Sequence, residues 1–382
     1  MSLPRFYCVA ASDRYNYGDL LFPLVAKYAL ESCGPCEFNN VAIIESDLSE
    51  IGALPTQDYS VFLAPNKMPI KSNILIAGGQ VVNSEWTQLL AFINERFVRL
   101  FERFKANKLR SKLYYKFNLA REPFPFVISN PETLANNRVF YHAVGGSVPL
   151  DKKKSALMQD ALEESAYLTV RDKRTRILLK NKMGLDAPIL PDSAMLYSEI
   201  RPREHLKRPV EHDYICAQFG YQKSKPNLQT ILRKLREVHK FFGMPIGLLS
   251  IGNCPGHDDM KVVEWIEEHA DFPVFRLKHD HIDDVTAAIA HAKLFIGTSL
   301  HGAIISMSYG NPFVAVNKNI KKLDSYTKTW APQYLKGCVD YQDIARESRV
   351  RMKSHVVYKS LVHRQQKMVI DSFKGIYEKA LS

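Results

Sequence analysis

Short runs of β-branched residues alternate with amphipathic segments along most of this chain, and this alternation constrains the fold more than any other feature. It is typical of parallel sheets covered by helices. The first unit combines a strand at 6–11, a polar loop at 12–18 and helically spaced apolar residues from Leu21 to Tyr28. Further strands are expected at 41–45, 61–64, 74–77, 139–144 and 167–170. The N-terminal part should therefore be a Rossmann-like α/β domain.

The alternation stops at about residues 198–213, where the sequence is charged and contains two prolines, as a linker would. It then resumes, with strands expected at 214–218, 246–251, 294–296 and 313–316. A chain of 382 residues is long enough for two cores. We expect two Rossmann-like domains that face a cleft. They should cover residues 1–200 and 213–345, and a helix over 350–382 should pack back across both.

The chain is basic, with a formal net charge of +12, so its surface should attract anions. No zinc-finger spacing or RNP-like aromatic pattern occurs, and we expect no nucleic acid partner. The start MSLPRFYC does not resemble a signal peptide, and no run of eighteen apolar residues occurs. The six cysteines are scattered rather than arranged as a disulfide framework. These features predict a cytoplasmic protein.

The segment 296–317, IGTSLHGAIISMSYGNPFVAVN, is the most informative motif. A strand should end at Gly297, and Ser299 and His301 should stand where the next helix begins. Backbone N–H groups at a helix start, beside a hydroxyl and an imidazole, suit a phosphate or a carboxylate. The alternative is that Ser299 only caps the helix and His301 is a hydrogen-bonded core histidine. The position after a strand, at the cleft, favours the first interpretation.

A second candidate is Arg171, which directly follows the strand at 167–170. A guanidinium fixed at a strand end suits bidentate capture of a carboxylate or phosphate. A surface ion pair between Arg171 and Asp172 explains the sequence equally well. Asp192, farther along, could orient a basic group or cap a turn.

Three N-terminal loops also follow expected strands. The first contains Asn16 and Asp19, which could bind substrate hydroxyls, although Asp19 could simply be an acidic residue in a first helical turn. The others contain glycine pairs that allow backbone to approach a ligand or form ordinary turns, namely Gly78 and Gly79, and Gly145 and Gly146. No GxGxxG or Walker motif indicates a dinucleotide or ATP, and no ligand spacing indicates a metal.

The run 96–121 mixes basic and aromatic residues and could contact an anionic membrane surface. The alternative is a helix with a solvated basic face and core aromatics. If the first interpretation holds, the protein works at the inner surface of the cell membrane.

Together, NYGD at 16–19, the AGGQ turn, LTVRDKRT, LPDSA and the 296–317 motif resemble the polysaccharide pyruvyl transferase family. Members of this family have a GT-B-like fold and transfer the pyruvyl group of phosphoenolpyruvate to exopolysaccharide, capsule or cell-wall glycans as a ketal. The resemblance implies that His301 and Arg171 are the donor-binding and catalytic pair and that Asp192 lies in a DPA-like motif. This sequence differs from the family pattern at Gln80, Ser193 and Leu300.

The resemblance therefore implies a transferase whose donor is phosphoenolpyruvate, whose acceptor is a glycan, lipid-linked or free, and which needs no cofactor. The C-terminal domain would bind the donor, with Ser299 and Gly302 beside His301. A divalent ion is not indicated. The alternatives are a GT-B glycosyltransferase that uses a nucleotide sugar and a catalytically inactive relative that only binds glycan or partner enzymes.

Overall fold

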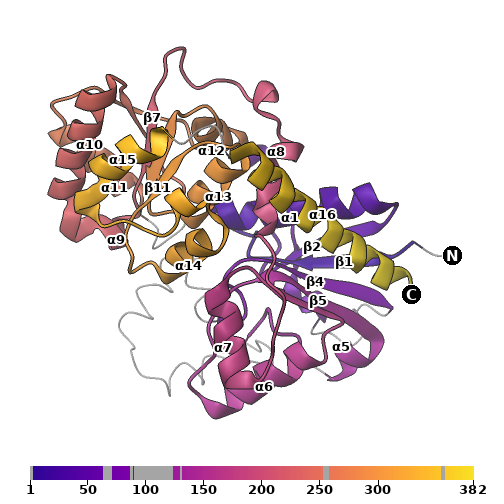
Figure 1. Cartoon of the computed structure of the whole chain (residues 1–382). Coiled ribbons are helices and arrows are strands. Elements are labelled where there is room, and N and C mark those ends of the chain that lie inside the picture. Colours follow the sequence, from indigo (N-terminus) through magenta and orange to yellow (C-terminus); the bar gives the residue numbers. More distant parts are fainter. Residues whose placement is uncertain are drawn as a thin grey trace.

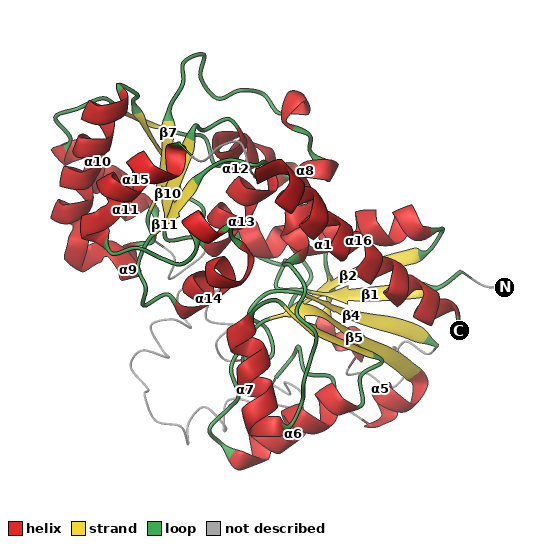
Figure 2. Cartoon of the chain, in the orientation of Figure 1, coloured by secondary structure: helices red, strands yellow, loops and turns green. Residues whose placement is uncertain are grey.

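Two parallel sheets with helices on both faces form the protein (Figures 1 and 2). The computed structural model describes residues 3–62, 71–86, 89, 124–129, 131–252, 258–353 and 358–382. The two-domain α/β class expected from the alternating pattern is confirmed. Each sheet has the strand order of a Rossmann domain, so each has a switch point where two successive loops diverge.

The N-terminal sheet has the order β3-β2-β1-β4-β5-β6. Its strands are β1 (Arg5–Val9), β2 (Glu37–Ala42), β3 (Gln57–Asp58), β4 (Ser72–Ala77), β5 (Asn137–Val144) and β6 (Tyr167–Val170). Its helices are α1 (Tyr17–Cys33), α5 (Pro131–Asn136), α6 (Lys152–Glu163) and α7 (Lys173–Met183). All of these strands pair in parallel, so their carboxyl ends lie at one edge.

The C-terminal sheet has the order β11-β10-β7-β8-β9. Its strands are β7 (Ile215–Gln218), β8 (Ile246–Leu248), β9 (Val274–Arg276), β10 (Leu294–Gly297) and β11 (Phe313–Ala315). Its helices are α9 (Tyr221–Ser224), α10 (Leu228–Phe242), α11 (Met260–His269), α12 (Ile282–Ala290), α13 (Leu300–Ser308), α14 (Lys321–Trp330) and α15 (Ile344–Met352). The short helix α8 (Tyr197–Ile200) and the long α16 (Tyr358–Leu381) lie outside the two sheets.

Three details differ from the expected strands. The strand expected at 41–45 runs from Glu37 to Ala42, because the buried Asn40 satisfies its amide on the carbonyls of Leu54 and Pro55. The strand expected at 61–64 is wrong in its described part, since residues 59–62 form a 3₁₀ turn after the two-residue β3. The edge strand β9 was not expected, because three partly exposed residues give no clear alternation.

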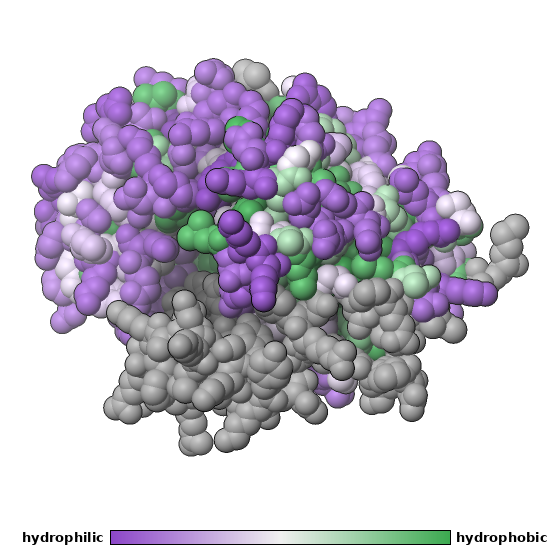
Figure 3. Space-filling model, turned by 90° about the horizontal axis from the view of Figure 1, so that it is seen from below, coloured by the Kyte–Doolittle hydropathy of each residue, from purple (hydrophilic) through white to green (hydrophobic). Residues whose placement is uncertain are grey.

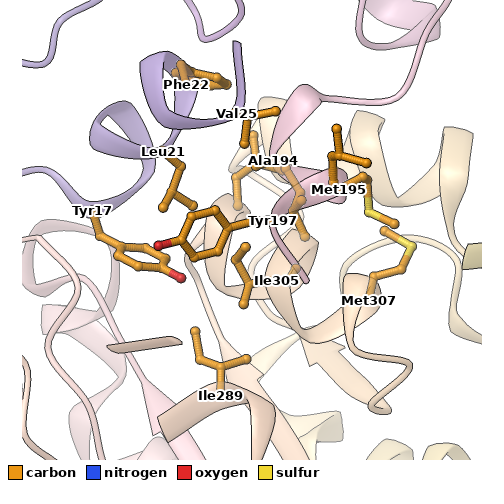
Figure 4. Close-up of a cluster of buried hydrophobic side chains, with 14 of the residues drawn as sticks. Tyr17, Leu21, Phe22, Val25, Ala194, Met195, Tyr197, Ile289, Ile305 and Met307 are labelled. Atoms are coloured by element: carbon orange, nitrogen blue, oxygen red, sulfur yellow. The ribbon is translucent and has the colours of Figure 1, made fainter. Parts of the chain in front are cut away.

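A hydrophobic layer lies between the two sheets and is shared by both domains. It combines apolar side chains of α1, α12 and α13 with those of the segment 194–197 and of α16. Figure 4 shows Tyr17 and Leu21 of α1 near Tyr197, and Val25 of α1 near Ala194, within this layer. The outer faces pack separately, against α6 and α7 in one domain and α10, α11 and α15 in the other. This shared layer holds the carboxyl edges of the two sheets toward each other.

The C-terminal helix α16 contacts both domains and lies alongside α1 in Figure 1. The hydroxyl of Tyr377 donates to the carbonyl of Pro35, and Ser372 lies 2.8 Å from the hydroxyl of Tyr167. Nearer its start, Gln365 donates to the carbonyl of Trp330 in α14. The expected boundaries at 200, 213 and 345 stay a prediction.

Hydrophilic side chains cover most of the surface formed by the helices at the left of Figure 1, as Figure 3 shows from below. Within the described ranges, no helix is both long and apolar enough to cross a membrane. The run 96–121 lies outside the described residues, so the expected membrane contact is untested.

Candidate functional site

A cavity of about 340 Å³ opens where the carboxyl edges of the two sheets meet. The N-terminal domain lines it with loops that follow β1, β4 and β6, and the C-terminal domain with loops that follow β7, β8 and β10 and with the start of α14. Loops at the carboxyl ends of parallel strands are the usual ligand-binding sites of such folds. Five predicted residues line the cavity: Asn16, Asp19, Arg171, Ser299 and His301.

His301 stands in the first turn of α13, as the motif predicts. Ser299 caps this helix, and its hydroxyl accepts from the N–H of Gly302 at 3.1 Å. The capping interpretation of Ser299 is therefore correct, although Ser299 also lines the cavity. His301 is not a hydrogen-bonded core histidine, because its Nε2 is buried and has no partner among the described residues.

The N-terminal domain presses α1 directly against the imidazole of His301. A Cβ atom on Gly18 would lie 1.8 Å from Nδ1 of His301, so only glycine fits there. The ring of Phe22 meets the imidazole edge-on, with centroids 5.4 Å apart. Sequence analysis missed Gly18, although it lies inside the NYGD motif. These contacts fix the ring orientation from the opposite domain.

The pKa of His301 lies well below its ordinary value of 6.5. Burial is the main cause, and the cations Arg171 and Lys322 add to it. The imidazole is therefore neutral at neutral pH in the free protein. A bound anion would offset the two cations and raise this pKa.

Arg171 is almost completely buried, with 2% of its surface exposed, yet it lines the cavity. Its Nη1 donates to Oδ2 of Asp192 at 3.1 Å, and its Nε has no partner among the described residues. A surface pair with Asp172 is wrong, because Asp172 caps α7 by accepting from the N–H of Thr175. Asp192 thus orients the guanidinium, and burial raises the pKa of this carboxyl despite Arg171.

Asn16 and Asp19 lie at the start of α1. Nδ2 of Asn16 donates to Oδ2 of Asp19 at 2.7 Å, and the backbone of Asn16 pairs with Gly252 of the other domain. Burial raises the pKa of Asp19 to about 6, while Lys322, Arg14 and Arg171 oppose this shift. Asp19 therefore titrates within about one unit of neutrality.

Three cations at the cavity were missed by the sequence analysis, namely Arg14, Lys223 and Lys322. Part of the Lys322 side chain is exposed to solvent. Its pKa is nevertheless lowered, chiefly by desolvation at the cavity and also by the charges of Arg171 and Lys223. Lys223 follows β7 and Lys322 begins α14, positions that look like ordinary surface lysines in the sequence. With Arg171, the two lysines give the cavity a cationic side that suits a multiply charged anion.

Comparison with known protein families shows which family the chain belongs to. The model of the polysaccharide pyruvyl transferases matches residues 16–319. The chain belongs to the polysaccharide pyruvyl transferase family. No curated protein matches the chain.

The solved structures show that this family member has a GT-B-like fold. A putative UDP-N-acetylglucosamine 2-epimerase from Listeria monocytogenes has a TM-score of 0.59 at 10% identity, over 100% of this chain and 97% of that chain. The UDP-GlcNAc 2-epimerase from Methanocaldococcus jannaschii has a TM-score of 0.57 at 9% identity, over 99% and 100%. The enzyme from Neisseria meningitidis, bound to UDP-GlcNAc, scores 0.54 at 9% identity, over 100% and 99%. At these identities the likeness concerns the fold alone.

The glycines expected to touch substrate do not line the cavity of this pyruvyl transferase family member. Gly145 instead makes room for Arg171, because a Cβ there would lie 2.6 Å from Nε. The space that a Cβ would need is occupied by Val82 at Gly146 and by the ring of Phe295 at Gly302. Gly78 and Gly79 have φ of 72° and 84° and form a left-handed turn against Phe22. Their role is to position the lining residues.

A buried network supports the helix that contains His301. Gln218, at the end of β7, accepts from the N–H of Ser299 at 2.9 Å and donates to Asp259 at 2.8 Å. Asp259 also accepts from the N–H groups of Ile251 and Gly252, and burial raises its pKa to about 6. Sequence analysis missed this network, although a glutamine that ends an apolar strand is a detectable signal.

Within the described part of the chain, no three His, Cys, Asp or Glu side chains gather as a metal site would require. The expectations that no metal, cofactor or nucleic acid takes part stay predictions, as does the cytoplasmic location.

Proposed function

We propose that the protein transfers the pyruvyl group of phosphoenolpyruvate to a sugar of a surface or cell-wall glycan, as a ketal. One observation carries this proposal: Arg171 of the N-terminal domain and His301 of the C-terminal domain face one cavity together with Lys322. A small donor in that cavity can contact all three. Phosphoenolpyruvate has a phosphate and a carboxylate, which suit a guanidinium with a free Nε, two lysines and the start of α13.

The reaction needs one proton transfer to carbon and one from each of two sugar hydroxyls. A proton adds to the methylene carbon of the donor, a sugar hydroxyl attacks the neighbouring carbon and loses its proton, and the C–O bond to phosphate breaks. A second hydroxyl then attacks the same carbon and loses its proton. Of the two hydroxyl protons, one replaces the proton given to the methylene carbon and the other leaves with inorganic phosphate.

In this mechanism, His301 is neutral before the donor binds and can accept a hydroxyl proton through Nε2. The phosphate and carboxylate would then offset Arg171 and Lys322, so the imidazolium is stabilised as it forms. Asp19, with a pKa of about 6, can also exchange a proton near neutral pH, whereas Asp259 has a similar pKa but accepts hydrogen bonds from Gln218 and two backbone N–H groups. Arg171 and Lys322 would stabilise the charge that develops on the departing phosphate.

The decisive experiment incubates the protein with phosphoenolpyruvate and a panel of nitrophenyl and lipid-linked glycosides. We expect release of inorganic phosphate that depends on the acceptor, and a product heavier than the acceptor by one pyruvate minus one water. A parallel arm offers nucleotide sugars. Release of nucleotide instead of phosphate would support a glycosyltransferase and contradict the proposal, and release of neither would support a protein that only binds.

A further inference from the structure

Arg14 is a buried cation in the cavity wall for which the donor chemistry gives no role. It is 7% exposed and follows β1. Its Nε donates to Oδ1 of Asp13 at 2.6 Å, and its Nη1 donates to the carbonyl of Leu89. Its Nη2 is also buried and lies 2.6 Å from the same Oδ1 of Asp13, so two nitrogens of the guanidinium share one carboxylate oxygen. A guanidinium has five N–H groups, so the second N–H of Nη1 and of Nη2 has no acceptor among the described residues and is available to a ligand.

The topology places Arg14 and Arg171 on opposite sides of the cavity. Arg14 follows β1 and Arg171 follows β6, and the sheet order puts β4 and β5 between these strands. Three strand spacings correspond to about 14 Å at the sheet edge. Asp19 lines the same cavity, and both guanidinium groups lower its pKa. A donor anchored by Arg171 and Lys322 therefore leaves the Arg14 side free.

Uncharged hydrogen-bonding groups line the cavity from the loop after the strand next to β1. Gln80, Asn83 and Ser84 line the cavity from the loop after β4, the strand that pairs directly with β1. Amides and hydroxyls can both donate to and accept from sugar hydroxyls. Phe126 and Leu89 add apolar surface to the same wall. This is a different chemical surface from the cationic side formed by Arg171, Lys223 and Lys322.

Asp13 keeps the Arg14 side close to electrical neutrality. Its Oδ1 pairs with Arg14 at 2.6 Å, and its Oδ2 accepts from the N–H of Ile44 at 3.1 Å. The carboxylate is thus held in place and fixes the guanidinium. A pair without net charge, whose terminal nitrogens keep further N–H groups, suits a sugar oxygen better than a second anion.

We propose that Arg14 determines acceptor specificity, and that with Gln80, Asn83 and Ser84 it forms the subsite for the acceptor sugar. In this arrangement the Arg14 guanidinium, held by Asp13, donates to a sugar oxygen, and two hydroxyls of the ring point toward Asp19 and His301. The inference rests on the proposed function for its position beside the donor. Sugar binding by the subsite can be measured without turnover.

The test compares Arg14→Lys and Gln80→Ala with the matched control Arg208→Gln, which changes an exposed arginine outside the cavity. Gln80 is exposed, so Gln80→Ala should fold even if the buried Arg14→Lys does not. We expect both variants to raise KM for the best glycoside by about tenfold, as loss of one charge-assisted or strong hydrogen bond implies. KM for phosphoenolpyruvate should change less than about twofold, because donor contacts stay intact.

A rise in KM for phosphoenolpyruvate with an unchanged acceptor KM would overturn the inference and make Arg14 a donor residue. Unchanged values for both substrates would assign Arg14 a structural role only. Saturation-transfer NMR with methyl glycosides, without donor, separates this inference from the proposed function. Glycoside signals that Gln80→Ala or Arg14→Lys weaken would support the subsite even if no phosphate is ever released. Signals of equal strength in wild type and both variants would contradict it.

Discussion

Two histidines of this protein, His142 and His301, both have a lowered pKa but lie in different surroundings. His142, in β5, is completely buried, stacks on Phe373 of α16 with centroids 4.3 Å apart, and has no partner for either ring nitrogen among the described residues. Burial alone lowers its pKa to about 3. His301 has a lowered pKa too, but it faces the cavity and two cations, Arg171 and Lys322, contribute to the shift.

The comparison teaches that a shifted pKa does not identify a functional histidine by itself. His142 is part of the packing between a strand and α16, where no substrate can reach it. His301 combines the same desolvation with a cavity and with two cations, Arg171 of the opposite domain and Lys322 of its own domain. A histidine with a lowered pKa is therefore a candidate site residue only where an anionic ligand can reach it, as at His301.

The largest expected effect separates the two histidines by mutation. His301→Gln should lower kcat by about a hundredfold to ten-thousandfold, because a proton-transfer group is lost, and should leave the melting temperature nearly unchanged. His142→Gln should leave kcat per folded molecule unchanged and lower the melting temperature, because the amide must be buried there. Steady-state kinetics and thermal melts on both proteins check this. Equal loss of kcat in both variants would remove the distinction.

Arg171→Lys tests the charged side of the cavity with a variant that keeps the positive charge beside Asp192. The more obvious Arg171→Ala would leave a buried carboxylate unpaired and endanger folding. We expect KM for phosphoenolpyruvate to rise by about tenfold to a hundredfold, because the forked hydrogen bonds are lost. Arg176→Lys, an exposed change on α7, serves as the control. An unchanged donor KM would mean that Arg171 only supports Asp192.

How much of this could be predicted depends on whether a feature is local. The strand β6 and the turn from β10 to α13 were predicted almost to the residue, because an apolar run followed by a cap is readable in one stretch of sequence. The five cavity residues were found for the same reason, since each follows a strand. The pairing of those residues was less predictable. Asp192 was expected to orient a basic group, but its partner Arg171 was not named, and Gly18 and Lys322 come close to His301 only through the packing of distant segments.

Asp19→Asn should produce a stability change that depends on pH. The folded pKa of about 6 is above the ordinary value of 3.8, so the stability that the carboxyl contributes is full below 3.8 and is lost as pH rises through 6. An asparagine does not ionise, so the variant should melt at a higher temperature than wild type at pH 8 and show a smaller difference at pH 4.5. Its turnover should fall. Melts at both pH values, beside kinetics, test this, and a variant that is less stable at pH 8 would contradict it.

A further expected effect concerns acid stability. The folded pKa of His142 is below the ordinary value of 6.5, so the unfolded chain takes up a proton first and stability is lost as pH falls below about 6.5. His142→Phe removes this group and should flatten the stability profile between pH 6.5 and 4. Urea unfolding at several pH values measures it. A profile as steep as that of wild type would mean that other groups dominate acid unfolding.

The central claim is that the cavity beside His301 binds an anionic donor, and NMR titration of the histidine ring protons tests it most directly. His301→Gln and His142→Gln identify the two signals. In the free protein both rings should stay neutral at pH 6.5. Saturating phosphoenolpyruvate should raise the pKa of His301 toward or above 6.5 and leave His142 unchanged. A His301 signal that is indifferent to phosphoenolpyruvate across the titration would contradict the account.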